Sequence, residues 1–545
     1  MTAFSLALDR VTFTLPDGRV LFSDLSTSFD TTPTGLVGRN GVGKSVLGRL
    51  LAGQLAPTGG QIQRQGRVHL LAQHSGAPAG RIADLAGVAP VLDALARIEA
   101  GSVDPDDFAC VGDRWTLRAQ LQALWQQLGL PALDPDAPAR QLSGGQAMQV
   151  AVAGALLSDA DALVLDEPSN HLDGAHRHRL LEALSQWRGG LIVISHDRTL
   201  LRQMQRIVEL TPQGLSSHGG NYDLYLQQKQ QAQRAAESEL ALRRHERRQQ
   251  QQAEREQRER QAHRQARATR DARTANQAPI LLGGMKQRSE QSAGRLQAQW
   301  AQRRADGDAR VRAAAAQVEA DVQVALLGPT LGRARPQVAL ELCDVQLPLL
   351  AAPLDRIDLR VPGGARLAVT GGNGSGKSTL LRVMAGRLPP LSGEVRRAVG
   401  CALLEQSVFD EGGDGTFIAD GSGAEPRSTL ALLQRANPAE SEGVLRTRLA
   451  LLGLDADRIL RPLHTLSGGE RMKAALAAVL YAEQPPPLLL LDEPGNHLDL
   501  PSLAALETML RSYTGTLVMV SHDEALLEAV GITHRLDATA AGWIA

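Results

Sequence analysis

An internal repeat constrains this 545-residue chain more than any other feature of its sequence. Four short motifs occur twice, in the same order, and the second copy follows the first at offsets between 324 and 333 residues. The pairs are GRNGVGKS (Gly38–Ser45) and GGNGSGKS (Gly371–Ser378), LSGGQ (Leu142–Gln146) and LSGGE (Leu466–Glu470), DEP (Asp166–Pro168) and DEP (Asp492–Pro494), and SHD (Ser195–Asp197) and SHD (Ser521–Asp523). The chain therefore contains two copies of one domain, one toward each end.

The residues around these motifs predict an α/β fold for each copy. Short apolar runs at Gly35–Val37 and Leu367–Val369 precede the glycine-rich motifs, and helix-like runs at Lys44–Ala52 and Lys377–Ala385 follow them. Continuous apolar runs that end at an Asp-Glu pair, at Ala162–Leu165 and Leu488–Leu491, are typical of buried parallel strands.

The pattern GxxxxGKS/T predicts a phosphate-binding loop, because its backbone N–H groups surround phosphates, its lysine reaches the terminal ones and its hydroxyl binds Mg²⁺. Only five of the 58 basic residues are lysines, and two of the five occupy the lysine position of this motif. We expect the following residues to contact nucleotide phosphates: Gly38, Asn40, Gly41, Gly43, Lys44 and Ser45 in the first copy, and Gly371, Asn373, Gly374, Gly376, Lys377, Ser378 and Thr379 in the second.

Acidic residues and a histidine follow the buried strands in both copies. Asp166 and Asp492 are predicted to bind the Mg²⁺ shell together with Ser45 and Ser378, and the adjacent Glu167 and Glu493 to polarise an attacking water as general bases. His196 and His522 each follow an apolar strand, where an imidazole can hydrogen-bond a γ-phosphate.

The segment between the copies has a different composition. Leu226–Ala275 contains neither proline nor glycine and is rich in Gln, Arg, Ala and Glu, which predicts one long helix. Asn276–Gly284 breaks it, and Met285–Leu327 reads as a return helix that is interrupted near Gly294 and Gly307, so a helical hairpin is expected. The net charge of the chain is -1, yet residues 222–320 carry 20 Lys and Arg against 12 Asp and Glu. The alternative is an extended solvated linker.

Composition excludes several classes of protein. Three scattered cysteines form neither a disulfide framework nor a zinc site, and no run of about 18 apolar residues predicts a membrane span or signal peptide. Aromatic residues make up 3% of the chain, which argues against base stacking on single strands as its main binding mode. A cytoplasmic protein is expected.

Taken together, these motifs resemble those of ATP-binding cassette domains, over about 435 residues. The resemblance implies two cassettes that close head to tail on two ATP molecules with Mg²⁺ as cofactor. It adds Gln73 and Gln406 as Mg²⁺ and nucleotide contacts, and Phe13 as an adenine-stacking aromatic of the first copy. It implies that Ser467 and Gly469 complete the first ATP site, and that Ser143 and Gly145 complete the second. The expected domains are cassettes at 1–221 and 329–545, joined by a basic helical hairpin at 222–328.

Two cassettes, an Asn-His-Leu-Asp sequence after each Asp-Glu pair (Asn170–Asp173 and Asn496–Asp499) and a basic linker resemble the ABC-F subfamily of translation factors. That resemblance implies a monomeric ATPase that binds the ribosome, with the linker directed toward rRNA, the P-site tRNA and the peptidyl transferase centre. Some members protect ribosomes from antibiotics instead. Two other hypotheses remain: the ATPase subunit of a transporter, which has no need of a basic hairpin, and a DNA-repair ATPase, which normally carries zinc-binding cysteines or very long coiled coils.

Overall fold

The structure of the chain is a computed structural model, which describes residues 4–72, 80–170, 172–274, 298–315, 337–405, 428–452, 454, 456–496 and 498–545. The chain divides into two compact units, one formed by Met1–Tyr222 with Val322–Ala545 and the other by Asp223–Asp321. The second unit lies within the predicted linker. The predicted boundaries at 221/222 and 328/329 stay predictions.

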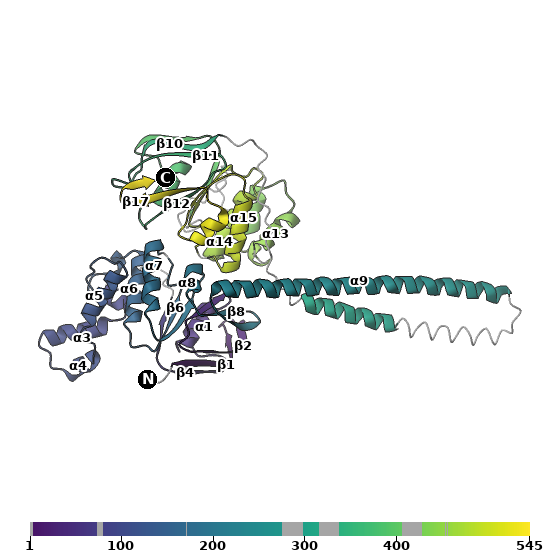
Figure 1. The fold of residues 1–545 in the computed structure, drawn as a ribbon, viewed down its shortest axis with the longest axis horizontal. Helices are drawn as coiled ribbons and strands as arrows, with labels where there is room; N and C mark the ends of the chain where they lie inside the picture. Colours follow the sequence, from purple (N-terminus) through teal and green to yellow (C-terminus); the bar gives the residue numbers. More distant parts are fainter. Residues whose placement is uncertain are drawn as a thin grey trace. The chain divides into compact units, whose positions relative to one another are not determined.

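The first cassette contains a six-stranded sheet and a three-stranded sheet (Figure 1). The strands of the larger sheet are, in order, β5 (Val68–Leu71), β6 (Ala162–Asp166), β7 (Gly190–Ile194), β3 (Thr34–Gly38), β8 (Arg206–Thr211) and β9 (Gly214–Gly219). The smaller sheet is β2 (Val20–Phe29), β1 (Ser5–Thr14) and β4 (Gly59–Gln65). The helices are α1 (Lys44–Leu51), α2 (Ile82–Leu85), α3 (Ala89–Glu99), α4 (Pro105–Val111), α5 (Leu117–Gln127), α6 (Gly144–Leu156), α7 (Gly174–Ser185) and α8 (Arg198–Arg202), with a 3-10 turn at Ala139–Gln141.

The second cassette repeats this architecture. Its larger sheet is β14 (Cys401–Leu404), β15 (Leu488–Asp492), β16 (Thr516–Val520), β12 (Arg366–Gly371), β17 (His534–Thr539) and β18 (Gly542–Ile544), and its smaller sheet is β11 (Arg356–Pro362), β10 (Val338–Gln346) and β13 (Ser392–Arg397). The helices are α11 (Lys377–Ala385), α12 (Thr429–Ala436), α13 (Glu442–Leu451), α14 (Gly468–Leu480), α15 (Leu500–Ser512) and α16 (Glu524–Val530), with 3-10 turns at Arg458–Leu460 and Leu463–Thr465.

The central strands are buried on both faces, as their continuous apolar sequences predict. Every residue of β6, β7, β15 and β16 is buried, and β6 pairs in parallel with β7 as β15 does with β16. Parallel strands end at the same edge of a sheet, so the acidic pair at the end of β6 lies beside the histidine that follows β7. The predicted α/β fold with two cassettes and a long helix between them is confirmed.

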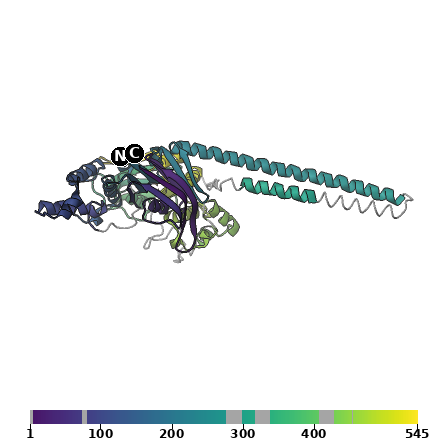
Figure 2. The same ribbon diagram turned by 90° about the horizontal axis from the view of Figure 1, so that it is seen from below.

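The second unit contains the long helix α9 (Tyr222–Thr274, 53 residues), where one long helix was predicted at Leu226–Ala275. Residues 298–315, inside the predicted return segment, are helical and lie alongside α9 (Figures 1 and 2). The interruption predicted near Gly307 is wrong, because the helix continues through this glycine. A Cβ added there would lie 3.2 Å from the side chain of Gln250 on α9, so the glycine allows the two helices to pack closely. Gly294 lies outside the described residues. Arg247 pairs with Asp308 across the two helices at 2.7 Å, and the guanidinium of Arg258 lies 5.1 Å from the centre of the buried Trp300 ring. The predicted break at Asn276–Gly284 lies outside the described residues.

Candidate functional site

Each glycine-rich loop joins a central strand to a helix and holds its lysine in a buried position. The Nζ of Lys44 donates to the carbonyl oxygens of Gly38 and Arg39 at 2.8 and 3.1 Å. Lys377 does the same with Gly371 and Gly372, both at 2.8 Å. Burial lowers the pKa of both lysines, and the nearby carboxylates oppose that shift.

The loops are shaped to admit a ligand against their backbone. Gly41 and Gly374 both have φ of 78°, and a Cβ added at either would meet nothing within 4 Å. Gly43 and Gly376, which precede α1 and α11, also have positive φ, and there a Cβ would meet Leu21 or Leu350 at less than 3 Å. Open backbone at a helix N-terminus beside a buried ammonium suits a phosphate chain.

Glu167 and Glu493 adopt the same unusual backbone conformation, with φ of 52° and 48°. Residues other than glycine rarely occupy this left-handed region, and such strain clusters at functional sites. Burial raises the pKa of Glu167 to about 8 and that of Glu493 to about 7, so both carboxyls bind protons near neutrality in the free protein. Carboxyls with pKa values near the working pH suit a general base.

The two histidines lie against these glutamates. The Nε2 of His196 is 3.6 Å from Glu167 Oε1 and 3.1 Å from Asn40 Oδ1, and His522 Nε2 is 3.5 Å from Glu493 Oε1. Burial, with a contribution from the loop lysines, lowers the pKa of His196 to about 3 and that of His522 to about 4. Both imidazoles are therefore neutral at pH 7.

A pair of hard oxygen ligands accompanies each loop. The hydroxyl of Ser45 hydrogen-bonds Asp166, and that of Ser378 hydrogen-bonds Asp492. Burial raises the pKa of both aspartates. Hydroxyl and carboxylate oxygens next to a phosphate loop are the donor set that Mg²⁺ takes, so the residues present fit this ion.

The two cassettes contact each other at the loops. The backbone N–H of Asn40 donates to Asp499 of the second cassette at 2.9 Å, and that of Asn373 donates to Asp173 of the first at 3.1 Å. A cavity of about 1190 Å³ takes in Lys44, Glu167, Glu493 and both histidines. Functional side chains from both repeats therefore line the same cavity.

The two LSGG motifs relate to this cavity differently. Ser467 and Gly469 line it, whereas its lining does not include Ser143 and Gly145. Both serines cap the helices they precede, since Ser143 Oγ accepts from Gln146 N–H at 3.2 Å and Ser467 Oγ from Glu470 N–H at 3.3 Å. The cavity is therefore lined by the phosphate loops and by the second LSGG motif, but not by the first.

Some predicted site residues lie elsewhere. Gln73 and Gln406 fall outside the described residues, and Thr379 is half-buried on α11. Phe13 packs against Phe22, with ring centroids 6.2 Å apart, and does not line the cavity. The lining residues near β1 and β2 are Leu15, Arg19 and Leu21, which lie in no motif and were not predicted. Adenine stacking on Phe13 stays a prediction.

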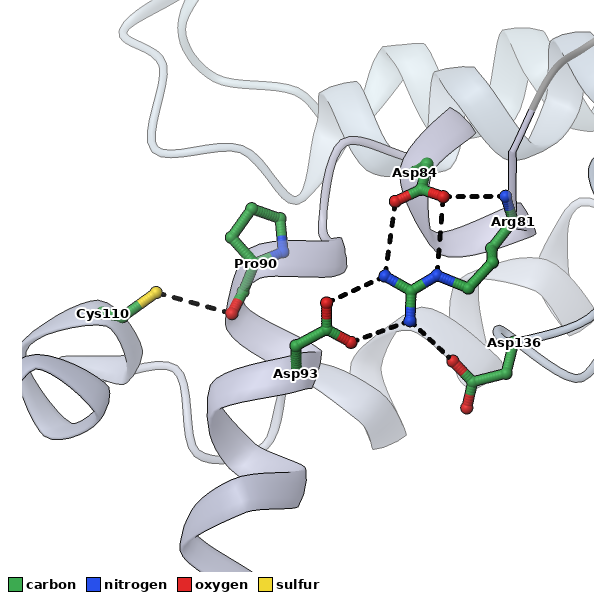
Figure 3. Close-up of polar contacts among 6 residues, drawn as sticks. All are labelled: Arg81, Asp84, Pro90, Asp93, Cys110 and Asp136. Atoms are coloured by element: carbon green, nitrogen blue, oxygen red, sulfur yellow. Dashed lines mark hydrogen bonds and ion pairs between the residues drawn. The ribbon is translucent and has the colours of Figure 1, made fainter. Parts of the chain in front are cut away.

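A charged cluster fixes the segment that leads to the first LSGG motif (Figure 3). The Arg81 guanidinium bonds both oxygens of Asp93, at 2.8 and 2.9 Å, and reaches Asp136 at 3.2 Å. The Arg81 N–H also donates to Asp84 at 2.7 Å, and hydrogen bonds from Arg81 lower the pKa values of Asp84 and Asp93. Arg81 thus ties α2, α3 and the approach to Ser143 together, a role that no motif signals.

Comparison with known proteins identifies the family. Residues 25–170 and 354–496 match a family model described as ABC transporter. The fold and the paired loops define a tandem ATP-binding cassette ATPase. Its relatives show that the chain belongs to the ABC-F family of ATP-binding cassette proteins, as predicted.

Three relatives illustrate this relationship. The Streptomyces fradiae tylosin resistance ATP-binding protein TlrC is 32% identical, over 94% of this chain and 93% of its own length. The probable ATP-binding protein YheS of Escherichia coli K12 is 31% identical, over 91% of this chain and 72% of its own. The ATP-binding protein Uup of Haemophilus influenzae is 30% identical, over 90% and 72%.

Solved structures share the fold. An archaeal ribosome recycling factor, in complex with a ribosomal stalk protein, aligns with a TM-score of 0.57 and 19% identity, over 97% of this chain and 87% of that one. An archaeal factor from a ribosome-bound assembly with Pelota aligns with a TM-score of 0.55 and 17% identity, over 97% and 76%. Among the described helices, none combines the length and the apolar character needed to cross a membrane.

Proposed function

We propose that this ABC-F ATPase binds the ribosome as a closed, ATP-bound monomer in the cytoplasm and modulates translation. In this proposal the basic hairpin is directed toward rRNA and tRNA near the peptidyl transferase centre. The names of two structural neighbours, a ribosome recycling factor and a ribosome-bound factor, support the choice of partner.

The observation that carries the proposal is the long helix α9. Its 53 residues span about 80 Å at about 1.5 Å per residue. Arg244, Arg248 and Arg255 are exposed on it, whereas Arg243 pairs with Glu239 at 2.7 Å within the helix. A long helix with exposed arginines suits contact with nucleic-acid phosphates through release of counterions.

Within each cassette the loop residues would position ATP for hydrolysis. Lys44 and Lys377 would bind the terminal phosphates, and Glu167 and Glu493 would accept a proton from the attacking water. Mg²⁺, held by the Ser-Asp pairs with Gln73 and Gln406, would neutralise phosphate charge. His196 and His522, neutral at pH 7, would hydrogen-bond the γ-phosphate.

Closure of the cassettes would complete both sites. Asp499 and Asp173 already hold the opposite phosphate loops, and the LSGG serines present helix N-termini suited to a phosphate. We propose that Ser467 and Gly469 complete the first site, and that Ser143 and Gly145 complete the second.

Co-sedimentation with ribosomes tests the proposal. The Glu167→Gln, Glu493→Gln double variant should retain ATP between closed cassettes and sediment with ribosomes in a sucrose gradient with ATP and Mg²⁺. A Lys44→Ala, Lys377→Ala double variant, which weakens ATP binding, is the matched control and should remain near the top. Equal sedimentation of the two variants would refute ATP-dependent ribosome binding.

The hairpin has its own test. Replacing Arg244, Arg248 and Arg255 by glutamine should weaken ribosome association and reduce the slope of log K against log salt by about 2 to 3, as expected for three lost phosphate contacts. The control replaces Arg243, which is paired within the helix, and should change that slope by less than about 1. An unchanged slope in the triple variant would contradict hairpin binding to RNA.

A more specific version of this function is protection of ribosomes from an antibiotic. The tylosin resistance protein of Streptomyces fradiae, which matches over 93% of its length, favours it. Expression of this chain in a tylosin-sensitive bacterium should raise the inhibitory concentration of tylosin, and Glu167→Gln should abolish that effect. Unchanged tylosin sensitivity would leave the general translation role as the proposal.

A further inference from the structure

Arg177 crosses from the first cassette to the second. It lies on α7, and its Nη1 donates to the backbone carbonyl of His522 at 3.1 Å. Its Nε lies 2.9 Å from Oδ2 of Asp197, the residue that follows His196. The guanidinium of Arg177 therefore contacts the residue that follows His196 and the backbone of His522.

Both ends of this contact are fixed by the fold. Asp173 caps α7 one turn before Arg177, and it also accepts the N–H of Asn373 in the second phosphate loop. Asp197 caps α8 by accepting the N–H of Thr199 at 2.9 Å. The side chain of Arg177 is 17% exposed, so little water competes for its partners.

Arg177 has an apolar residue as its counterpart in the second repeat. At the offset of 326 residues that relates His196 to His522, Arg177 corresponds to Leu503, a buried apolar residue of α15. Arg177 and Leu503 both line the cavity, so the asymmetry lies at the sites themselves.

We propose that Arg177 is a positioning residue for ATP hydrolysis at the second site, where it anchors the backbone of His522 to the Asp197 segment of the first site. The inference rests on the proposed role of Glu493 as general base and is independent of ribosome binding. It makes the second site depend on the conformation of the first.

The surroundings of His522 agree with this role. The Nε2 of His522 lies 3.5 Å from Oε1 of Glu493, so a displacement of the His522 backbone would move the imidazole relative to the proposed base. Loss of the Arg177 contact should therefore lower kcat at the second site and leave KM for ATP nearly unchanged. A contact that only holds the cassettes together would change KM as well.

The test measures kcat and KM for ATP in four full-length proteins that all carry Glu167→Gln, so that the second site supplies the remaining turnover. The first has no further change, and the others add Arg177→Leu, Arg177→Lys or Arg198→Leu. Arg177→Leu, which installs the residue of the other repeat, should lower kcat about tenfold with KM changed less than about twofold. Arg177→Lys, which keeps a charged donor at this position, should restore most of the lost kcat.

Arg198→Leu is the matched control. Arg198 forms another buried ion pair between the cassettes, with Glu507 at 2.5 Å, and does not line the cavity. Arg198→Leu should change kcat by less than about twofold. An equal loss of kcat in the Arg198→Leu protein, or no loss in the Arg177→Leu protein, would overturn the proposal.

Single glutamate variants assign the effect to a site and separate it from the proposed function. If neither Glu167→Gln nor Glu493→Gln lowers turnover, the proposed bases are wrong regardless of Arg177. Arg177→Leu should act fully in the Glu167→Gln background and by less than about twofold in the Glu493→Gln background. Equal losses in both backgrounds would show a general interface role and refute the assignment.

Discussion

The raised pKa of Glu493 predicts that its replacement by glutamine stabilises the free protein at alkaline pH. In the folded state the pKa is about 7 against an ordinary value of 4.5. The folded protein binds this proton more tightly than the unfolded chain, so the stabilising contribution is fully present below about pH 4.5 and is lost as the pH rises to about 7. Glutamine does not titrate and avoids that loss.

The size of the effect follows from the shift. A difference of about 2.5 pKa units corresponds to about 3 kcal/mol, of which about 2 to 3 kcal/mol develops between pH 5 and pH 8. For a cassette of about 200 residues this amounts to about 5 to 10 °C in Tm. Changes in packing caused by the substitution do not depend on pH, so they cancel in the comparison of the two pH values.

The assay is thermal unfolding of the full chain, followed by circular dichroism at pH 5 and pH 8 with EDTA and without nucleotide. The Tm of Glu493→Gln minus the Tm of the unmutated protein should be larger at pH 8 than at pH 5. Glu528→Gln, at an exposed position of α16 in the same cassette, is the control and should show no such gain. A Tm difference that is equal at both pH values would refute the reasoning.

Three further outcomes are expected. Arg81→Gln should speed proteolytic cleavage before the first LSGG motif, because it breaks the cluster of Figure 3, whereas Arg97→Gln, which loses one ion pair with Asp107, should not. Asp166→Asn should raise the Mg²⁺ concentration for half-maximal ATP turnover about tenfold or more, through loss of a charged ligand, and an unchanged Mg²⁺ requirement would contradict the assignment. Trp300→Ala should cost about 3 kcal/mol of hairpin packing and so raise hydrogen exchange in residues 298–315 about 100-fold, which mass spectrometry can follow.

The fold could be predicted because its signals are local. The apolar run before Asp166 is a buried strand, and the helix after the first phosphate loop begins at Lys44 as predicted. Such signals depend on residues that are close in sequence. Each motif also occurs twice, so a prediction made from one copy could be checked against the other. The absence of proline and glycine predicted the long linker helix in the same way.

Contacts between distant residues could not be predicted. Arg81 meets Asp136 across 55 positions, and Arg177 meets His522 across 345, and neither lies in a motif. The inward position of Phe13 follows from the pleat of β1, which sets side chains on alternate faces, yet the sequence alone did not show which face lines the cavity. The linker arginines also looked alike, although the structure pairs Arg247 with Asp308 and leaves Arg244 exposed.

The two sites are alike in their motifs and unlike in what the opposite cassette contributes. Each has its lysine, Ser-Asp pair, glutamate and histidine in matching geometry, so these residues give no reason for the sites to differ. Helix α14, which follows the second LSGG motif, carries Arg471 and Lys473. The corresponding residues of α6 are Ala147 and Gln149. Arg471 lines the cavity. Arg177 in turn occupies the position that Leu503 holds in the other repeat. Any difference in turnover between the sites should therefore trace to these cross-cassette cations, and exchanging them should alter that difference while both sets of motifs stay intact.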